Sequence, residues 1–167
     1  MKTVIKFVCF ILALFVLSCS SNASDATPAP IPNIPTSDDF IRAADMSYLP
    51  LIESEGTIYK KNGVAENAIT TLKNAGCNTI RIRIWKNPSD NHSGLAEVKA
   101  LALRVKQAGM KVWLTVHYSD TWADPGNQTP PSDWTNLSFA NLKTAVSTYT
   151  TLLMTEIQPD IIQIGNE

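Results

Sequence analysis

The side chains best suited to chemistry stand where apolar segments of the chain end. Asn166 and Glu167 follow the apolar run at 161–164, and His117 follows the apolar run at 110–116. A third run, 79–84, includes Arg81 and Arg83. A carboxyl group beside such polar neighbours is suited to general acid–base chemistry. We therefore interpret these residues as one side of an active site, with Glu167 as its catalytic carboxylate.

The elements that position these residues repeat one unit, a helix closed by a glycine and followed by an apolar strand. Gly76 and Gly109 occupy the closing position in the two copies, before strands at 77–82 and 110–116. The preceding helices show apolar residues at helical spacing. The first stripe is Ala65, Ala68, Ile69, Leu72 and Ala75, and the second is Leu95, Val98, Leu101, Ala102, Val105 and Ala108.

A third helix is predicted over 138–157, followed by a fourth strand over 160–165, and the first strand is placed at about 40–47. The resulting order, βαβαβαβ, indicates a parallel sheet with right-handed crossovers. Isoleucines alternate with Arg81, Arg83 and Trp85 along the second strand. Because an open sheet covered on both faces would bury two arginines in apolar packing, we expect a (β/α)8 TIM barrel, in which strand ends form the site. Residues 38–167 would supply its first four strands and three helices.

The N-terminal segment reads as an export signal. Lys2 and Lys6 precede a short apolar run, and 16–19 resembles a bacterial lipobox ending in Cys19. We expect a signal peptide at 1–18, lipid on Cys19, a Pro/Ser/Ala-rich tether at 19–37 and anchoring at the cell surface or in the periplasm. The alternative is an ordinary secretory signal with a chance cysteine, which would leave the protein secreted.

Composition narrows the possible partners. The formal net charge is −1 and no basic run is present, so we predict no nucleic-acid partner. No second His or Cys stands at metal-ligand spacing from His117, and no metal or other cofactor is predicted. Nothing in the sequence indicates a protein partner.

One long loop motif gives a specific resemblance. The segment His117–Gly126, HYSDTWADPG, with Gln128 behind it, resembles the loop after the third strand in family 53 glycoside hydrolases, the endo-β-1,4-galactanases. Supporting matches are 78–85 with Asn87-Pro88, 44–47, and 163–167. Thr115 departs from this pattern, which has an aspartate there. The resemblance covers about 40–167, the first half of the family's domain.

The resemblance implies a retaining glycosidase with two glutamates. Glu167 would be the acid/base and Asn166 would bind the sugar 2-hydroxyl, while the nucleophile lies on a seventh strand that the 167 residues do not include. Arg81 and Arg83 would hold the catalytic carboxylates in place, and the alternative is that they form structural ion pairs. Of the two, Arg81 is the better match to the arginine that holds the nucleophile. His117 would be an inward hydrogen-bonding group or a purely structural one.

Aromatic and acidic residues complete the predicted substrate site. Trp85, Tyr118, Trp122 and Trp134 are candidates for sugar stacking, with core packing as the alternative, and Asp120 and Asp124 either bind hydroxyls or brace the loop. We expect hydrolysis of β-1,4-galactan, the pectic arabinogalactan side chain, and no activity from these 167 residues alone. Alternatives are another retaining glycosidase, such as a mannanase or cellulase, or a non-catalytic glycan-binding surface lipoprotein.

Overall fold

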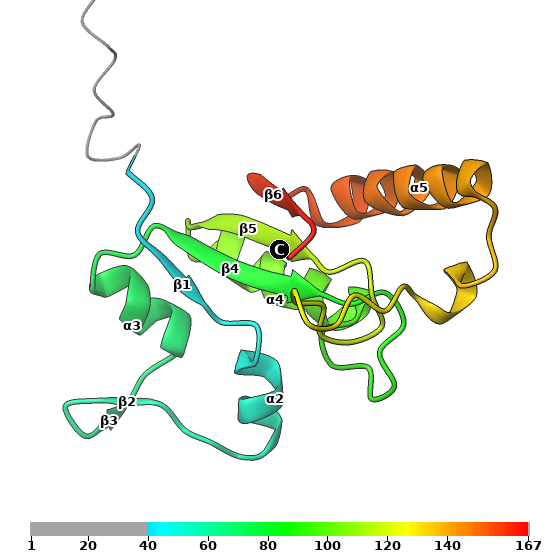
Figure 1. Cartoon of the computed structure of the whole chain (residues 1–167). Coiled ribbons are helices and arrows are strands. Elements are labelled where there is room, and N and C mark those ends of the chain that lie inside the picture. Colours follow the sequence, from blue (N-terminus) through cyan, green and yellow to red (C-terminus); the bar gives the residue numbers. More distant parts are fainter. Residues whose placement is uncertain (1–39, 167) are drawn as a thin grey trace, which may run out of the picture. The chain divides into compact units, whose positions relative to one another are not determined.

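The computed structural model describes residues 40–166 (Figure 1). The predicted signal peptide, the lipidation site Cys19 and the tether at 19–37 lie outside the described residues, as does Glu167. None of the helices within 40–166 is long and apolar enough to span a membrane.

A four-stranded parallel sheet organises the described part of the chain. Its order is β1 (Ala43–Asp45), β4 (Thr79–Ile84), β5 (Lys111–Val116) and β6 (Ile161–Ile164). The parallel sheet and the four predicted strands are confirmed, although β1 is shorter than the predicted range of 40–47. The register places Arg83 beside Thr115, so both belong to the same inner layer at the strand ends.

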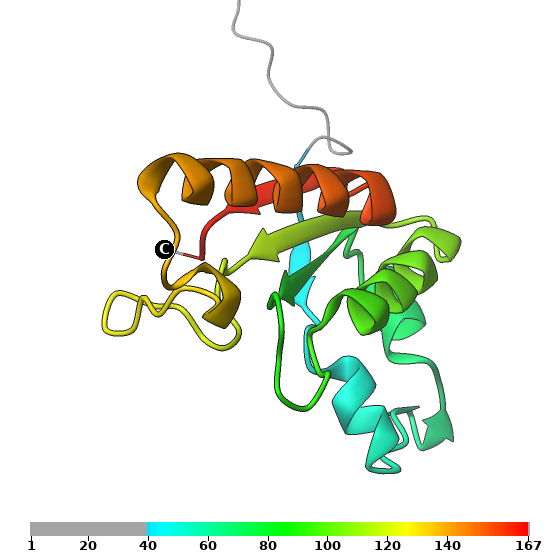
Figure 2. The same cartoon turned by 90° about the vertical axis from the view of Figure 1, so that its right-hand side faces the viewer.

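Three helices connect these strands: α3 (Ala68–Asn74), α4 (Leu95–Gln107) and α5 (Phe139–Ile157). Gly76 and Gly109 have φ angles of 98° and 69°, the left-handed conformation predicted for residues that close a helix. Figure 2 shows the arrowheads of β4 and β5 directed toward the yellow connection between β5 and α5. This connection includes the short 3₁₀ turn η2 (Ser132–Trp134).

The first connection is more elaborate than the sequence indicates. It holds the short helix α2 (Leu49–Ser54) and a hairpin of β2 (Lys60–Lys61) and β3 (Val64–Ala65). Ala65 was predicted to share the apolar stripe of the following helix, and this is wrong, because it lies exposed in β3. The helix starts later because the Asn67 side chain accepts hydrogen bonds from the backbone N–H groups of Ile69 and Thr70 and caps it.

The apolar core lies between the sheet and the helices. Alternate residues of β4 and β5 are fully buried, and α4 contributes four buried residues to the same cluster. The sheet members are Ile80, Ile82, Ile84, Val112, Leu114 and Val116, and the helix members are Val98, Leu101, Ala102 and Val105. The intervening residues of β4 and β5 therefore face the opposite, inner side of the sheet, as in a barrel.

Candidate active site at the carboxyl ends of the strands

Arg81 links the first and last strands of the sheet. Its Nη1 donates to Asp45 Oδ2 at 2.5 Å, and its Nη2 donates to Asn166 Oδ1 at 3.1 Å. Asp45 also accepts from the backbone N–H of Ser47 at 2.9 Å. Although burial opposes ionisation of Asp45, the hydrogen bonds from Ser47 and Arg81 outweigh it and hold the pKa of this carboxyl below its usual value. Arg81 thus orients an amide at the end of β6.

Asn166 is held on several sides at a turn in the backbone. Gly165 has a φ of 90°, which redirects the chain after β6. The Asn166 side chain then donates to the Ala123 carbonyl at 2.7 Å, and the Asn166 carbonyl accepts from Gln163 Nε2 at 2.6 Å. Gln163 in turn accepts from the Thr115 hydroxyl at 3.2 Å. Thr115 therefore makes an inward hydrogen bond although it stands where the family has an aspartate, and this bond supports the turn after β6.

His117 and Asn166 hold the same residue of the long loop. The backbone N–H of Ala123 donates to His117 Nδ1 at 3.1 Å, while the Ala123 carbonyl accepts from Asn166. Burial, together with the positive charges of Arg83 and Arg81, lowers the pKa of His117 to about 4. The imidazole is therefore neutral near pH 7. Because Nδ1 accepts a hydrogen bond, its proton lies on Nε2, which is buried and has no partner among the described residues.

Among the described residues, the Arg83 guanidinium contacts a cage of aromatic rings and forms no ion pair. Its guanidinium carbon is 3.8 Å from the ring centroid of Tyr48, 4.6 Å from that of Trp122 and 4.8 Å from that of Trp85. The residue is 3% exposed, and its guanidinium makes no hydrogen bond or ion pair with residues 40–166. The rings stabilise the charge through cation–π attraction.

Trp85, Trp122 and His117 form one aromatic group at the strand ends. Their ring centroids lie 5.3 to 6.3 Å apart in edge-on arrangements. Trp122 stays 42% exposed even though it packs on Arg83, whereas His117 is buried. An exposed indole at this place has room for the apolar face of a sugar ring.

Tyr118 and Trp134 lie in a different aromatic group. Tyr118 has a φ of 49°, and its hydroxyl hydrogen-bonds Thr150 of α5 at 2.7 Å. The rings of Tyr118, Trp134 and Tyr149 lie within 6.0 to 6.4 Å of one another, and Trp134 is buried. The structure does not bring these two residues together with Trp85 and Trp122, and their surroundings match the core-packing alternative.

Asp120 and Asp124 both brace the loop. Asp120 accepts hydrogen bonds from the backbone N–H of Asn87 and from the backbone and hydroxyl of Ser132. Burial opposes its ionisation, but these hydrogen bonds and the charge of Lys86 lower the pKa of the carboxyl. Asp124 accepts from the backbone N–H of Gly126 at 2.8 Å. Of the two readings proposed for these residues, the observed contacts match the loop-bracing one.

Several residues of this site had no predicted role. Asp45, Tyr48 and Gln163 contact Arg81, Arg83 and Asn166 respectively. Asp45 is the last residue of β1, so its place at the end of a strand was the available signal. The contribution of Ala123 comes from its backbone and leaves no signal in side-chain types. Glu167 lies outside the described residues, directly after Asn166.

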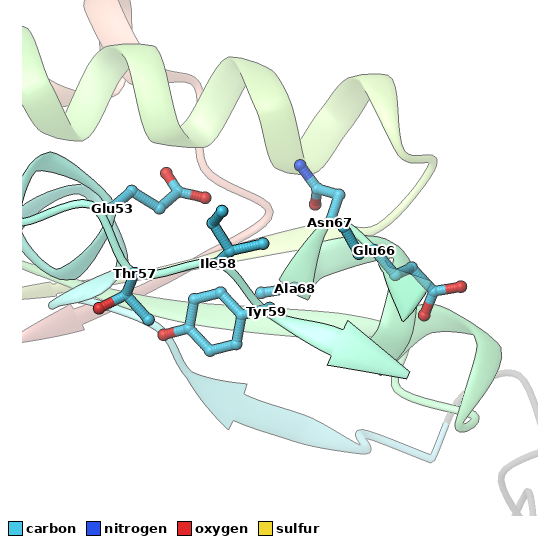
Figure 3. A pocket seen from close by; sticks show the side chains of 8 residues that line it. Glu53, Thr57, Ile58, Tyr59, Glu66, Asn67 and Ala68 are labelled. Atoms are coloured by element: carbon cyan, nitrogen blue, oxygen red, sulfur yellow. The ribbon is translucent and has the colours of Figure 1, made fainter. Parts of the chain in front are cut away.

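One pocket borders this site, and another lies away from it. One, of about 260 Å³, is lined by His117, Ala123 and Asn166 and extends to α5. The other, of about 310 Å³, lies beside α2 and the start of α3 (Figure 3). Its two carboxylates are already bound, Glu53 by Arg104 at 2.7 and 2.9 Å and Glu66 by the Thr71 hydroxyl. Within 40–166 no group of three or more His, Cys, Asp or Glu side chains is placed to hold a metal ion.

The architecture and the strand-end site define this molecule as part of a (β/α)8 barrel. Comparison with known proteins identifies which barrel: residues 41–167 match the family described as Glycosyl hydrolase family 53, and the chain belongs to that family.

Relatives and solved structures agree with this assignment. The chain is 43% identical to the arabinogalactan endo-beta-1,4-galactanase A of Emericella nidulans over 75% of its own length and 38% of the relative's. It is 39% identical to the endo-beta-1,4-galactanase of Bacillus subtilis, covering 77% of this chain and 33% of the relative. The catalytic domain of the Ignisphaera aggregans family 53 protein superposes with a TM-score of 0.74 at 37% identity, covering 83% of this chain and 42% of that one. The chain spans less than half the length of these relatives.

Proposed function

We propose that the protein is a retaining endo-glycosidase that hydrolyses β-1,4-galactan, with Glu167 as its general acid and base. One observation carries the proposal. Asn166 is fixed by Arg81, Ala123 and Gln163 at the turn after β6, beside the group of His117, Trp85 and Trp122. Because Glu167 follows Asn166 directly in the sequence, we propose that it acts on a sugar ring that packs on Trp122.

A retaining mechanism needs a second carboxylate about 5–5.5 Å from the first. Asp45 does not meet this need, because Ser47 binds one of its oxygens and Arg81 binds the other. We propose that the nucleophile comes from a part of the protein outside the described residues. The acid/base glutamate would first protonate the leaving oxygen and then activate the water that releases the sugar.

The relatives' names support galactan as the substrate, since those from Emericella nidulans and Bacillus subtilis are named as β-1,4-galactanases. In the loop, Asp120 and Asp124 brace the backbone, while Ala123 is held by both His117 and Asn166. Trp122 is therefore presented to a ligand by a fixed backbone. We propose Trp122 as the main sugar-stacking residue among those described.

The test is activity on a panel of polysaccharides. The protein is purified from the cells that make it and incubated with β-1,4-galactan, mannan and a soluble cellulose derivative. Galactan alone should be cleaved, and Glu167→Gln should lower the rate by about 10²- to 10⁴-fold. Glu55→Gln, an exposed change at the end of α2, is the matched control and should leave the rate unchanged. Cleavage of mannan or cellulose in preference to galactan would contradict the proposal.

We also propose that Cys19 carries a lipid anchor and that 19–37 tethers the barrel to a membrane surface. The intact mass of the native protein from its membrane fraction tests this. Loss of residues 1–18 together with added acyl mass at Cys19 is expected. A mature protein that has no acyl mass and occurs only in the medium would contradict it.

A further inference from the structure

A cluster of charged and polar side chains joins two loops beside the sugar-binding region. Asp120 Oδ1 accepts from the backbone N–H of Asn87 at 3.0 Å, and its Oδ2 accepts from the backbone N–H and the hydroxyl of Ser132 at 2.9 and 2.7 Å. Asn87 belongs to the connection between β4 and α4, whereas Asp120 and Ser132 belong to the connection between β5 and α5. One carboxylate therefore brings three stretches of backbone together.

Lys86 and Asp133 form a second link between the same two loops. Lys86 Nζ lies 2.5 Å from Asp133 Oδ2, and Asn87 Nδ2 donates to Asp133 Oδ1 at 3.3 Å. The backbone N–H of Lys86 also donates to the Ser119 carbonyl at 2.8 Å. All these contacts join residues within the described range 40–166. The loop latch is the name used below for Lys86, Asn87, Asp120, Ser132 and Asp133.

The second aromatic group holds the cation of the loop latch. Lys86 Nζ lies 5.4 Å from the ring centroid of Trp134 and 5.8 Å from that of Tyr149, distances at which cation–π attraction acts. Trp134 is buried in η2 and Tyr149 is buried in α5. The Lys86 side chain is only 15% exposed. The loop latch is therefore attached to elements that pack in the apolar core.

The loop latch closes the base of the segment that carries Trp122. Asp120 and Ser132 stand at the two ends of this segment, so their hydrogen bonds make 120–132 a closed loop. Inside it, Asn127 Nδ2 donates to the Trp122 carbonyl at 3.3 Å. Trp122 follows Asp120 by two positions and remains 42% exposed. Because the base of the loop is fixed, the backbone that presents the Trp122 indole is fixed with it.

We propose that the loop latch positions Trp122 for sugar stacking, with Asp120 as the main positioning residue. The proposal rests on the proposed function and deepens it, since it names residues that set the affinity of the same site for galactan. Asp120 acts through Trp122 and not on the sugar, because donors of Asn87 and Ser132 occupy both of its oxygens. Loss of the Asp120 carboxylate should therefore weaken substrate binding more than it slows the chemical step.

Kinetics of the native protein on β-1,4-galactan test this coupling. Asp120→Asn replaces one carboxylate oxygen by an NH₂ group, which cannot accept a hydrogen bond. This substitution should raise KM by about tenfold with a smaller change in kcat. In a Trp122→Ala background it should leave KM unchanged, because the residue that Asp120 positions is then absent. An equal further rise in KM in that background would overturn the proposal.

Tryptophan fluorescence measures the positioning without any substrate. Trp122 is exposed, whereas the other three tryptophans of the sequence are buried or half-buried. Acrylamide quenching of Trp122 is taken as the difference between each protein and its Trp122→Phe counterpart. It should increase in Asp120→Asn and, in the same direction, in the milder variant Asp133→Asn, which removes the charge beside Lys86. Unchanged quenching in both variants would refute the positioning role.

Lys99→Gln is the matched control for a lost ion pair. Lys99 pairs with Glu156 and joins α4 to the last turn of α5, away from the two loops. This substitution should change neither the quenching of Trp122 nor the KM for galactan. An effect equal to that of Asp133→Asn would contradict a specific role for the loop latch.

The two proposals fail in different ways. Increased quenching of Trp122 in Asp120→Asn, in a protein that cleaves no galactan, refutes only the galactanase proposal. Cleavage of galactan with unchanged quenching, or with additive effects of Asp120→Asn and Trp122→Ala on KM, refutes only the loop latch.

Discussion

Protonation of His117 should destabilise the folded chain at mildly acidic pH. The pKa of His117 is lowered from an ordinary 6.5 to about 4 by burial and by the charges of Arg83 and Arg81. The unfolded chain therefore takes up this proton at higher pH than the folded chain does. The stabilising contribution is complete above pH 6.5 and is lost progressively as the pH falls from 6.5 to 4.

The size of the effect follows from the shift. One unit of pKa corresponds to about 1.4 kcal/mol, so moving from pH 7 to pH 4.5 should remove about 2 kcal/mol through this group. The structural reason is that a protonated Nδ1 can no longer accept the Ala123 N–H, and the imidazolium would lie beside the Arg83 guanidinium.

Urea unfolding at several pH values measures this contribution. The free energy of unfolding is compared between wild type and His117→Asn, whose amide oxygen can accept the Ala123 N–H but does not titrate. His92 has a pKa raised by its hydrogen bond to Glu97, an effect of opposite sign, and it is present in both chains, so it cancels. The wild type should lose about 2 kcal/mol more than His117→Asn between pH 7 and 4.5. Parallel pH profiles would refute the reasoning.

Three further substitutions test other parts of the structure. Asn166→Ala should lower the kcat/KM of the native protein on galactan by about 100-fold, because the amide is expected to bind the sugar 2-hydroxyl in the transition state; a normal kcat/KM would contradict that role. Leu114→Ala removes a fully buried side chain of β5 and should cost about 2–5 kcal/mol in urea unfolding, whereas Val64→Ala, in the exposed hairpin, should change stability by less than about 0.5 kcal/mol. Asn67→Ala removes the cap of α3 and should cost about 1 kcal/mol, while Asn141→Ala, exposed in the first turn of α5, should cost less; equal losses would argue against the cap.

The helices and strands could be predicted because their residue types and their pattern of burial indicate the same structure. Gly76 and Gly109 occupy the left-handed positions that end helices, and the stripe on α4 coincides with its buried face. The alternation along β4 places isoleucine in the core and arginine on the inner side. In these segments the spacing of a few residue types determines the structure.

The first connection could not be predicted for a physical reason. Helix α2 has six residues and no side-chain cap on its first turn, and the strands of the hairpin have two residues each. Elements this short depend on contacts with the rest of the molecule, such as the bidentate pair between Glu53 of α2 and Arg104 of α4.

The sequence predicted which residues form the candidate site better than it predicted the contacts between them. Strand-end position singled out His117 and Asn166, and the alternation along β4 singled out Arg81; the structure connects these residues through hydrogen bonds. Alternation along a strand does not determine where the next side chain points once the backbone turns. Tyr118 shows this, because its positive φ directs the ring toward α5 and away from Trp122.

The stereochemistry of galactan hydrolysis tests the central claim most directly. Proton NMR of the first products released from β-1,4-galactan by the native protein distinguishes the two anomers before they equilibrate. A double displacement that uses Glu167 and a second carboxylate predicts that the β-anomer appears first and the α-anomer grows in later. Initial release of the α-anomer, or no release at all from β-1,4-galactan, would contradict the account.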